Sequence, residues 1–294
     1  MRIFKFKSIL TAALLVLVVS CREPGQKTFQ VKGTVKEVMA ERKKVKLEHE
    51  EIPGYMAAMT MTFDVKEAAE LANLQPGDTV SFRMIVTKND GWIDQIKKTG
   101  AASTIVSAAP DNFRRVREVE PLKIGDPMPD YRFTNELGQA ISLSELKGNA
   151  VAFTFIFTRC PFPTFCPRMS GNLAEAHQKL KTMANGPANW RLLSITIDPQ
   201  FDTPAVLKSY AQRYKYDPKH WSHVTGELID ITAISEQFGL VFYRPDPSQP
   251  AGLSHNLRTV VIDAQGRVQR VFTENEWKVD DLVAEILKAA AQKG

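Results

Sequence analysis

The second half of the chain is organised around the segment Phe157-Thr158-Arg159-Cys160-Pro161-Phe162-Pro163-Thr164-Phe165-Cys166-Pro167. A continuous apolar and β-branched run over residues 150–157 leads into it, which predicts a buried strand. Residues 168–183 then predict a helix, and Pro167 suits the first position of that helix. The segment is therefore expected to be a strand-to-helix turn, the place in an α/β sheet where ligands bind.

Cys160 and Cys166 are two of only three cysteines in the chain. Cys166 directly precedes Pro167, where exposed backbone N–H groups and the helix dipole favour a thiolate, the form that binds metals and attacks disulfides. A close cysteine pair in an exported protein indicates a redox or metal site, and a small structural disulfide across the loop is the alternative.

Around this turn, strands and helices alternate to the end of the chain. The pattern predicts a strand over 191–197, a helix opened by Asp202-Thr203-Pro204 with Asp202 or Thr203 as its cap, a helix over 229–238, a hairpin over 257–272 and a helix over 279–291. This order predicts an α/β sandwich with helices on both faces.

The first half has a different periodicity. Apolar residues alternate with polar ones in five short runs between residues 29 and 98, and Pro76-Gly77-Asp78 and Asn89-Asp90-Gly91 supply turns. Five short strands of this kind predict a small all-β barrel. Residues 99–120 lose periodicity and are interpreted as a linker.

The N-terminus determines the expected compartment. Arg2, Lys5 and Lys7 precede an apolar run over residues 8–20, the layout of a secretory signal, and the run ends at Cys21. Leu17-Val18-Val19-Ser20-Cys21 resembles a bacterial lipobox, in which the cysteine is acylated and becomes the mature N-terminus. A transmembrane anchor is the alternative, but the run is shorter than the roughly 20 apolar residues that a spanning helix needs.

Charge argues against a nucleic-acid function. The formal net charge of +5 includes three basic residues of the expected signal, so residues 21–294 carry +2. A nucleic-acid surface requires a strong basic patch or a recognisable motif, and neither is present in the sequence.

Residues 122–294 resemble the Sco/SenC family of thioredoxin-like copper chaperones, which assist the copper centre of cytochrome c oxidase. The matching pieces are Gly125-Asp126-Pro127, Thr158-Arg159-Cys160-Pro161 with its second Cys-Pro, Thr196-Ile197-Asp198-Pro199, Asp202-Thr203-Pro204 and Ser254-His255. The resemblance implies a thioredoxin-like fold in which Cys160, Cys166 and His255 bind copper. Two thiolates suit Cu(I), and an added imidazole lets the same site hold Cu(II). The family's commoner spacing has three residues between the cysteines, whereas this chain has five.

A methionine-rich segment gives the first half its own candidate site. Met59 and Met61 point to one face of a strand about 7 Å apart, so both sulfurs can turn toward one soft ion. Alternation into the core, continued by Phe63, is the competing interpretation.

Residues 30–98 resemble the small periplasmic copper-binding barrels of the CusF type, which implies that His49, Met59 and Met61 are copper ligands. Met56 occupies the place where that family has a tryptophan against the ion, so a further sulfur is expected there.

The remaining polar residues receive structural roles. We interpret His177, His220 and His223 as surface residues. Asp198 and Asp202 are interpreted mainly as turn and helix-cap residues. A further option for Asp198 is that it supports the metal ligands without binding the metal itself. A single histidine before a strand is usually not a ligand, so His255 is assigned on the resemblance.

Together these features predict a lipid-anchored protein of the bacterial cell envelope that faces the periplasm. Its domains are expected to be a signal peptide over 1–20, a copper-binding barrel over 28–98, a linker over 99–120 and a thioredoxin-like domain over 121–294. We expect a metallochaperone that binds Cu(I) and Cu(II) and delivers copper to a cuproenzyme, with the copper-bearing subunit of cytochrome c oxidase as the expected partner.

Three alternatives remain. A thiol-disulfide oxidoreductase would use Cys160 and Cys166 as its catalytic redox pair to reduce a client's copper-site cysteines, and would not need His255. Copper sequestration would require the barrel alone. A peroxiredoxin shares the fold but is disfavoured, because the run before Cys160 lacks that family's proline and threonine spacing.

Overall fold

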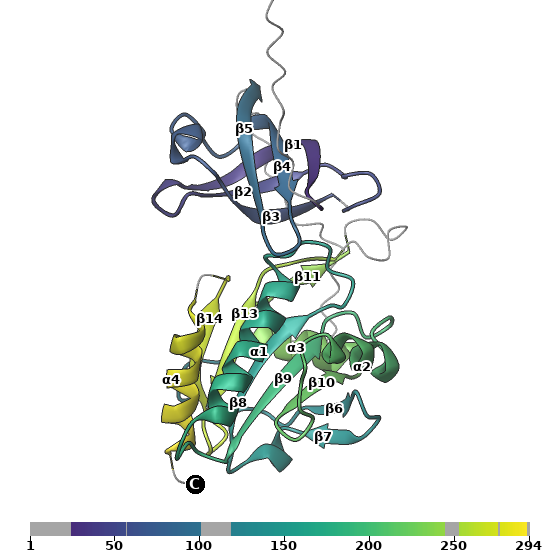
Figure 1. The fold of residues 1–294 in the computed structure, drawn as a ribbon, viewed down its shortest axis with the longest axis vertical. Helices are drawn as coiled ribbons and strands as arrows, with labels where there is room; N and C mark the ends of the chain where they lie inside the picture. Colours follow the sequence, from purple (N-terminus) through teal and green to yellow (C-terminus); the bar gives the residue numbers. More distant parts are fainter. Residues whose placement is uncertain (1–24, 57, 101–118, 245–252, 276, 293–294) are drawn as a thin grey trace, which may run out of the picture.

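The computed structural model describes residues 25–56, 58–100, 119–244, 253–275 and 277–292. The expected signal peptide with Cys21 and residues 101–118 of the expected linker lie outside the described residues. Figure 1 shows a β-sheet unit, formed by residues 25–100, stacked on one end of a larger α/β unit.

The N-terminal unit is a curled, five-stranded antiparallel sheet in the order β3-β2-β1-β4-β5. Its strands are β1 (Lys27–Met39), β2 (Lys44–His49), β3 (Met59–Asp64), β4 (Thr79–Val86) and β5 (Gly91–Gly100), with short 3-10 helices η1 (Ala40–Arg42) and η2 (Ala68–Leu71). A bridge between Val65 and Ile93 joins the two sheet edges, which closes the barrel around an apolar interior that includes Phe63 and Phe82. The expected barrel is thus confirmed, although β5 runs through Gly100 into the expected linker.

Barrel closure requires close backbone approach beside the expected copper segment. Gly33 of β1 pairs with His49 of β2, and a Cβ at Gly33 would lie 2.7 Å from the carbonyl oxygen of Glu48. A glycine is therefore needed at this point. Further along β1, its pairing with β2 shifts by one residue between Val35 and Glu37.

The C-terminal unit contains a seven-stranded sheet in the order β14-β13-β8-β9-β10-β6-β7. The central strands β8 (Ala150–Ile156), β9 (Trp190–Thr196) and β10 (Trp221–Thr225) are parallel, and antiparallel pairs flank them: β6 (Arg132–Asn135) with β7 (Ala140–Ser142), and β13 (Arg258–Ile262) with β14 (Val268–Thr273). Two short strands, β11 (Phe242–Tyr243) and β12 (Ser254–His255), form a separate pair, and η3 (Ser144–Leu146) follows β7.

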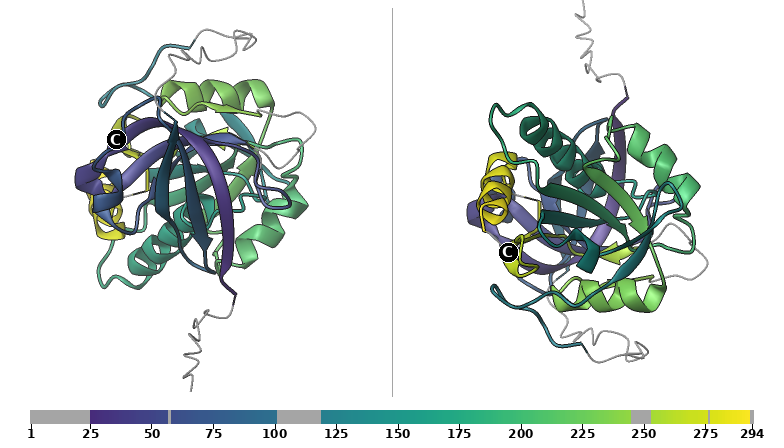
Figure 2. Two further views of the ribbon diagram at one scale, coloured as in Figure 1. Left: turned by 90° about the horizontal axis from the view of Figure 1, so that it is seen from above. Right: turned by 90° about the horizontal axis from the view of Figure 1, so that it is seen from below.

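Helices cover both faces of this sheet, as the sequence predicted. They are α1 (Cys166–Thr182), α2 (Pro204–Gln212), α3 (Leu228–Gln237) and α4 (Val279–Ala290). Both views in Figure 2 place α3 on the opposite side of the sheet from α1 and α2. All seven residues of β8 are buried because the strand packs on both faces: Ala150 and Ala152 against α1 and α4, Phe153 and Phe155 toward α3.

Two histidines that were expected on the surface are buried. His177 is 1% exposed because it lies on the apolar face of α1, where its ring contacts Trp190 and Trp221. His223 is 0% exposed and stacks on Trp221, and burial lowers its pKa to about 3. His220 is partly exposed and stacks on Trp190. The interpretation of His177 and His223 as surface residues was wrong.

Candidate copper sites

The cysteine segment leaves β8 and enters α1, as expected, and α1 begins at Cys166 itself. Cys166 is 0% exposed, whereas Cys160 is only partly buried. Both are free thiols, so the loop is not closed by a disulfide in this structure.

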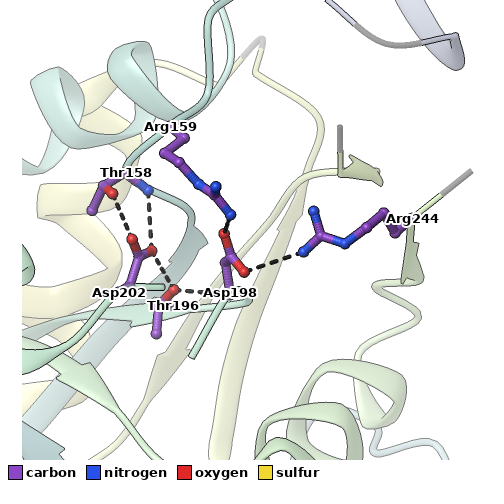
Figure 3. Close-up of polar contacts among 6 residues, drawn as sticks. All are labelled: Thr158, Arg159, Thr196, Asp198, Asp202 and Arg244. Atoms are coloured by element: carbon purple, nitrogen blue, oxygen red, sulfur yellow. Dashed lines mark hydrogen bonds and ion pairs between the residues drawn. The ribbon is translucent and has the colours of Figure 1, made fainter. Parts of the chain in front are cut away.

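A buried carboxylate holds the start of this segment. Asp202 is fully buried and accepts hydrogen bonds from the Thr158 backbone N–H (3.1 Å), the Thr158 hydroxyl (2.5 Å) and the Thr196 hydroxyl (2.6 Å) (Figure 3). Thr203, whose hydroxyl accepts from the N–H of Val206, is the cap of α2 instead. Of the two caps that the sequence allowed, Thr203 is confirmed and Asp202 is not; Asp202 instead fixes the turn before Cys160.

A second carboxylate fixes the neighbour of Cys160. Asp198 lies between two arginines and contacts Arg159 at 2.5 Å and Arg244 at 3.3 Å (Figure 3). The Arg159 guanidinium also lies 3.8 Å from the ring centre of Phe201. Asp198 was expected mainly in a turn, with a supporting role behind the ligands as a further option, whereas no role was expected for Arg159, which lies within the matched Thr158-Arg159-Cys160-Pro161 motif.

The two thiols differ electrostatically. Hydrogen bonding from the Cys166 thiol, with a smaller contribution from His255, lowers the pKa of Cys160. Burial raises the pKa of Cys166. The burial of the Cys166 sulfur and its position at the helix start therefore act on this pKa in opposite directions.

His255 on β12 lies against the cysteine segment. Its Nε2 is 3.6 Å from Cys166 Sγ, and its Nδ1 is 2.8 Å from the carbonyl oxygen of Asn256. Because a carbonyl only accepts, Nδ1 carries a proton, and Nε2 is the ring nitrogen directed toward the cysteines. The rings of Phe157 and Phe165 flank the imidazole.

These three side chains are neighbours without being a finished coordination sphere. Among the described residues, no three His, Cys, Asp or Glu side chains are arranged so that they could hold an ion together.

The barrel presents the second expected set. His49 ends β2 directly opposite Met59 of β3, and Met61 follows on the same face. The Nδ1 of His49 lies 2.7 Å from the Glu50 carbonyl oxygen, so Nε2 carries the lone pair; it is buried and has no hydrogen-bond partner. Burial also lowers the pKa of His49, which keeps the imidazole neutral. An unpaired, neutral imidazole nitrogen beside a thioether fits a soft metal ion.

Residues from both sets line one cavity of about 20 Å³ at the boundary of the two units. Three methionines of the barrel, Met56, Met59 and Met61, line it together with Cys160 and His255. Its volume suits a single water-sized particle or ion. His49 and Cys166 are not among the lining residues.

The long loop between the cysteines forms much of this boundary. Phe162 is 2% exposed and packs edge-on against Phe63 of the barrel, with ring centres 5.9 Å apart. A Cβ at Gly91 of β5 would lie 2.7 Å from the Phe162 ring, so a glycine makes room for it. The Tyr55 hydroxyl donates to the Pro161 carbonyl at 2.9 Å. The five-residue spacing thus places an aromatic side chain in the barrel.

Each of the two structural units matches a known protein family. The SCO1/SenC family model matches residues 117–291, and the model described as copper binding periplasmic protein CusF matches residues 28–98.

Several known proteins match the C-terminal unit. A SCO1 protein homolog from Bacillus subtilis is 28% identical over 180 residues, which cover 60% of this chain and 84% of the relative. The structure of BsSco, described as a member of the Sco family of cytochrome c oxidase assembly proteins with a disulfide switch, is 26% identical with a TM-score of 0.50, covering 60% of this chain and 99% of that one. A SCO1/SenC family lipoprotein from Bacillus anthracis has the same fold, with 24% identity, a TM-score of 0.50 and coverage of 59% and 99%.

These matches assign copper as the metal of the protein and a thioredoxin-like fold to its C-terminal unit. The chain therefore belongs to the SCO1/SenC family, as a two-domain copper protein whose N-terminal domain is of the CusF type.

Proposed function

We propose that this protein is a cell-envelope copper metallochaperone that delivers copper to the copper centre of cytochrome c oxidase. The barrel binds Cu(I) through His49, Met59 and Met61, and Cys160, Cys166 and His255 bind copper for delivery. The single observation that carries the proposal is that His49 and His255 are each held by an Nδ1–H bond to the next residue's carbonyl, so that Nε2 is the nitrogen available to a metal; the Nε2 of His255 lies 3.6 Å from Cys166 Sγ.

The donor chemistry supports different tasks for the two sites. Thioethers are neutral and cannot form disulfides, so the barrel set suits acquisition of Cu(I) in an oxidising compartment. Thiolates with an imidazole hold both oxidation states, which suits delivery to a cysteine- and histidine-containing acceptor. Met56, 5% exposed beside the other two methionines, provides a further sulfur.

The test is copper transfer to a purified, copper-free soluble domain of the oxidase copper subunit. The full chain, loaded with one equivalent of Cu(I) under reducing conditions, should transfer copper to the acceptor, and metal analysis of the two proteins after their separation measures this transfer. Cys160→Ser and Cys166→Ser should abolish transfer, whereas Leu137→Ala, a change of an exposed side chain in the turn between β6 and β7, should not. Transfer at the parent rate by both cysteine variants would refute the proposal.

A thiol-disulfide oxidoreductase is the second candidate, and the asymmetry of the two thiols favours it. The Cys160 thiolate would attack a client disulfide and release one client thiolate, which takes a proton from water. Cys166 would then lose its proton, attack the mixed disulfide and release the second client thiol, leaving a Cys160–Cys166 disulfide and a client reduced by two electrons.

Copper-free protein and the oxidised acceptor domain separate the two candidates. An oxidoreductase should generate two acceptor thiols per chain, and Cys166→Ser should stop at a trapped mixed disulfide. His255→Ala should leave this reduction intact while impairing copper transfer. Failure to reduce the acceptor would eliminate the second candidate and leave the first standing.

We also propose that residues 1–20 are a signal peptide and that lipidated Cys21 anchors the protein to a membrane, facing the periplasm. The lipoprotein description of the Bacillus anthracis relative and the periplasmic description of the CusF model support this. Among the described residues, no helix has the length and apolar character needed to cross a membrane. Cys21→Ser should release the protein from the membrane fraction, and continued sedimentation with membranes would refute the anchor.

A further inference from the structure

The cavity between the domains contains donors from both of them. Cys160 and His255 come from the thioredoxin-like domain, and Met56, Met59 and Met61 come from the barrel. Phe157, Phe162, Phe165 and Leu253 line the rest of it, so its walls are sulfur, imidazole and hydrocarbon. Such a wall can bind a soft monovalent ion without offering hard oxygen ligands.

The domains are held together around this cavity on several sides. Phe162 fills a space in the barrel, and the Tyr55 hydroxyl bonds to the Pro161 carbonyl. Arg168 of α1 contacts Asp90 at 3.1 Å, at the turn before β5. The Ser254 hydroxyl lies 3.5 Å from the carbonyl oxygen of Thr60, between Met59 and Met61. The donors of the two domains are therefore kept facing one another.

The composition of the lining differs from both ligand sets of the proposed function. It includes Cys160 but not Cys166, and the methionines but not His49. Within the described residues, Cys160, Cys166 and His255 do not by themselves form a closed site. In this closed arrangement, the barrel methionines are the donors available to complete a coordination sphere around Cys160 and His255.

We propose that the cavity is an interdomain Cu(I) site, in which Cys160, His255 and at least one thioether of Met59 or Met61 bind one ion, and through which copper passes from the barrel to the thioredoxin-like domain. This inference rests on the proposed function, because it joins the two sites assigned there. It adds a third, mixed position that neither domain possesses alone.

The transfer is a ligand exchange without a change in oxidation state. Cu(I) leaves His49 and bonds to Cys160, whose sulfur engages as thiolate, and any thiol proton passes to water. The ion next bonds to Cys166, which also releases its proton to water, as the methionine sulfurs depart with their lone pairs. Copper remains Cu(I) throughout and is never released into solvent.

The first experiment measures the affinity for the first equivalent of Cu(I) in the full chain, by competition with a chromophoric Cu(I) chelator under reducing conditions. Two variants are compared with the parent: Cys160→Ser, and the volume-conserving double change Met59→Leu with Met61→Leu. For a shared site, both should weaken the first equivalent, each by at least about tenfold, because each removes a direct ligand. For two independent sites, only the variant that damages the stronger site weakens it, and that result would overturn the inference.

The second experiment separates the domains without touching a ligand. Gly91→Leu places a side chain where a Cβ already lies 2.7 Å from the Phe162 ring, and Gly171→Leu is the matched control, since a Cβ there meets nothing within 4 Å. Gly91→Leu should lower the affinity for the first equivalent of Cu(I) by at least about tenfold. When Cys160→Ser and the methionine double change are each added to Gly91→Leu, only one of them should lower this affinity further. Gly171→Leu should behave as the parent.

The outcomes distinguish the inference from the proposed function. Parental affinity in Gly91→Leu, with its domains shown to be separated by small-angle scattering, would overturn the interdomain site and leave the two separate sites in place. Should neither Cys160→Ser nor the methionine double change affect Cu(I) binding, the proposed function itself would fail.

Discussion

Replacing Phe162 by alanine tests whether the long cysteine loop is what joins the two domains. The side chain is 2% exposed and belongs to the thioredoxin-like domain, where it packs against Phe165, but it also packs edge-on against Phe63 and lies against Gly91 of the barrel. Removing a buried Phe side chain lowers stability by about 3–5 kcal/mol. The contact between two aromatic rings contributes roughly 0.5–1.5 kcal/mol in addition to the burial of their surface area. Most of this loss falls on domain association, which should weaken by about a hundredfold or more.

Small-angle scattering and calorimetry provide the assay. The Phe162→Ala protein should have a larger radius of gyration than the parent and should unfold in two transitions, because the domains are no longer coupled. Phe201→Ala is the control, since that ring is 41% exposed and contacts Arg159 rather than the barrel. A Phe162→Ala protein with parental scattering and a single parental transition would refute the assignment of the loop as a docking element.

Three further predictions concern the ligands and the buried histidine. His255→Ala should weaken Cu(II) binding more than Cu(I) binding, because two thiolates still hold Cu(I); equal Cu(II) spectra in variant and parent would exclude His255 as a ligand. In a selenomethionine-labelled chain that carries one copper ion, acidification should move the ion from cysteine sulfur to methionine selenium, and X-ray absorption distinguishes these neighbours. The reason is that Cys160 and Cys166 take up protons, while burial keeps the pKa of His49 low. A spectrum that does not change with pH would contradict the ligand assignment. His223, with a folded pKa of about 3 against about 6.5 unfolded, contributes stability above pH 6.5 that is lost as pH falls toward 3, at about 1.4 kcal/mol per pH unit. His223→Phe should therefore flatten the pH dependence of urea unfolding, and an unchanged slope would show that the residue is not buried neutral.

The elements themselves could be predicted from local patterns. Alternation in residues 29–98 indicated the five barrel strands, and the apolar run into the cysteine segment indicated β8 and the turn into α1. Such patterns work because strand and helix periodicities depend on near neighbours in sequence. The errors arose where burial by distant segments decided the outcome: His177 and His223 are covered by Trp190 and Trp221.

The sequence by itself therefore determined the two fold classes, the family resemblances and the residue types of both candidate copper sites. Only the tertiary structure decided that the two sites face one another, that Asp202 holds the turn before Cys160, and that the extra residues between the cysteines place Phe162 inside the barrel. The physical reason is that docking depends on shape complementarity between surfaces far apart in the chain. A ring fits beside Gly91 because that residue has no side chain, and neither residue alone predicts the other.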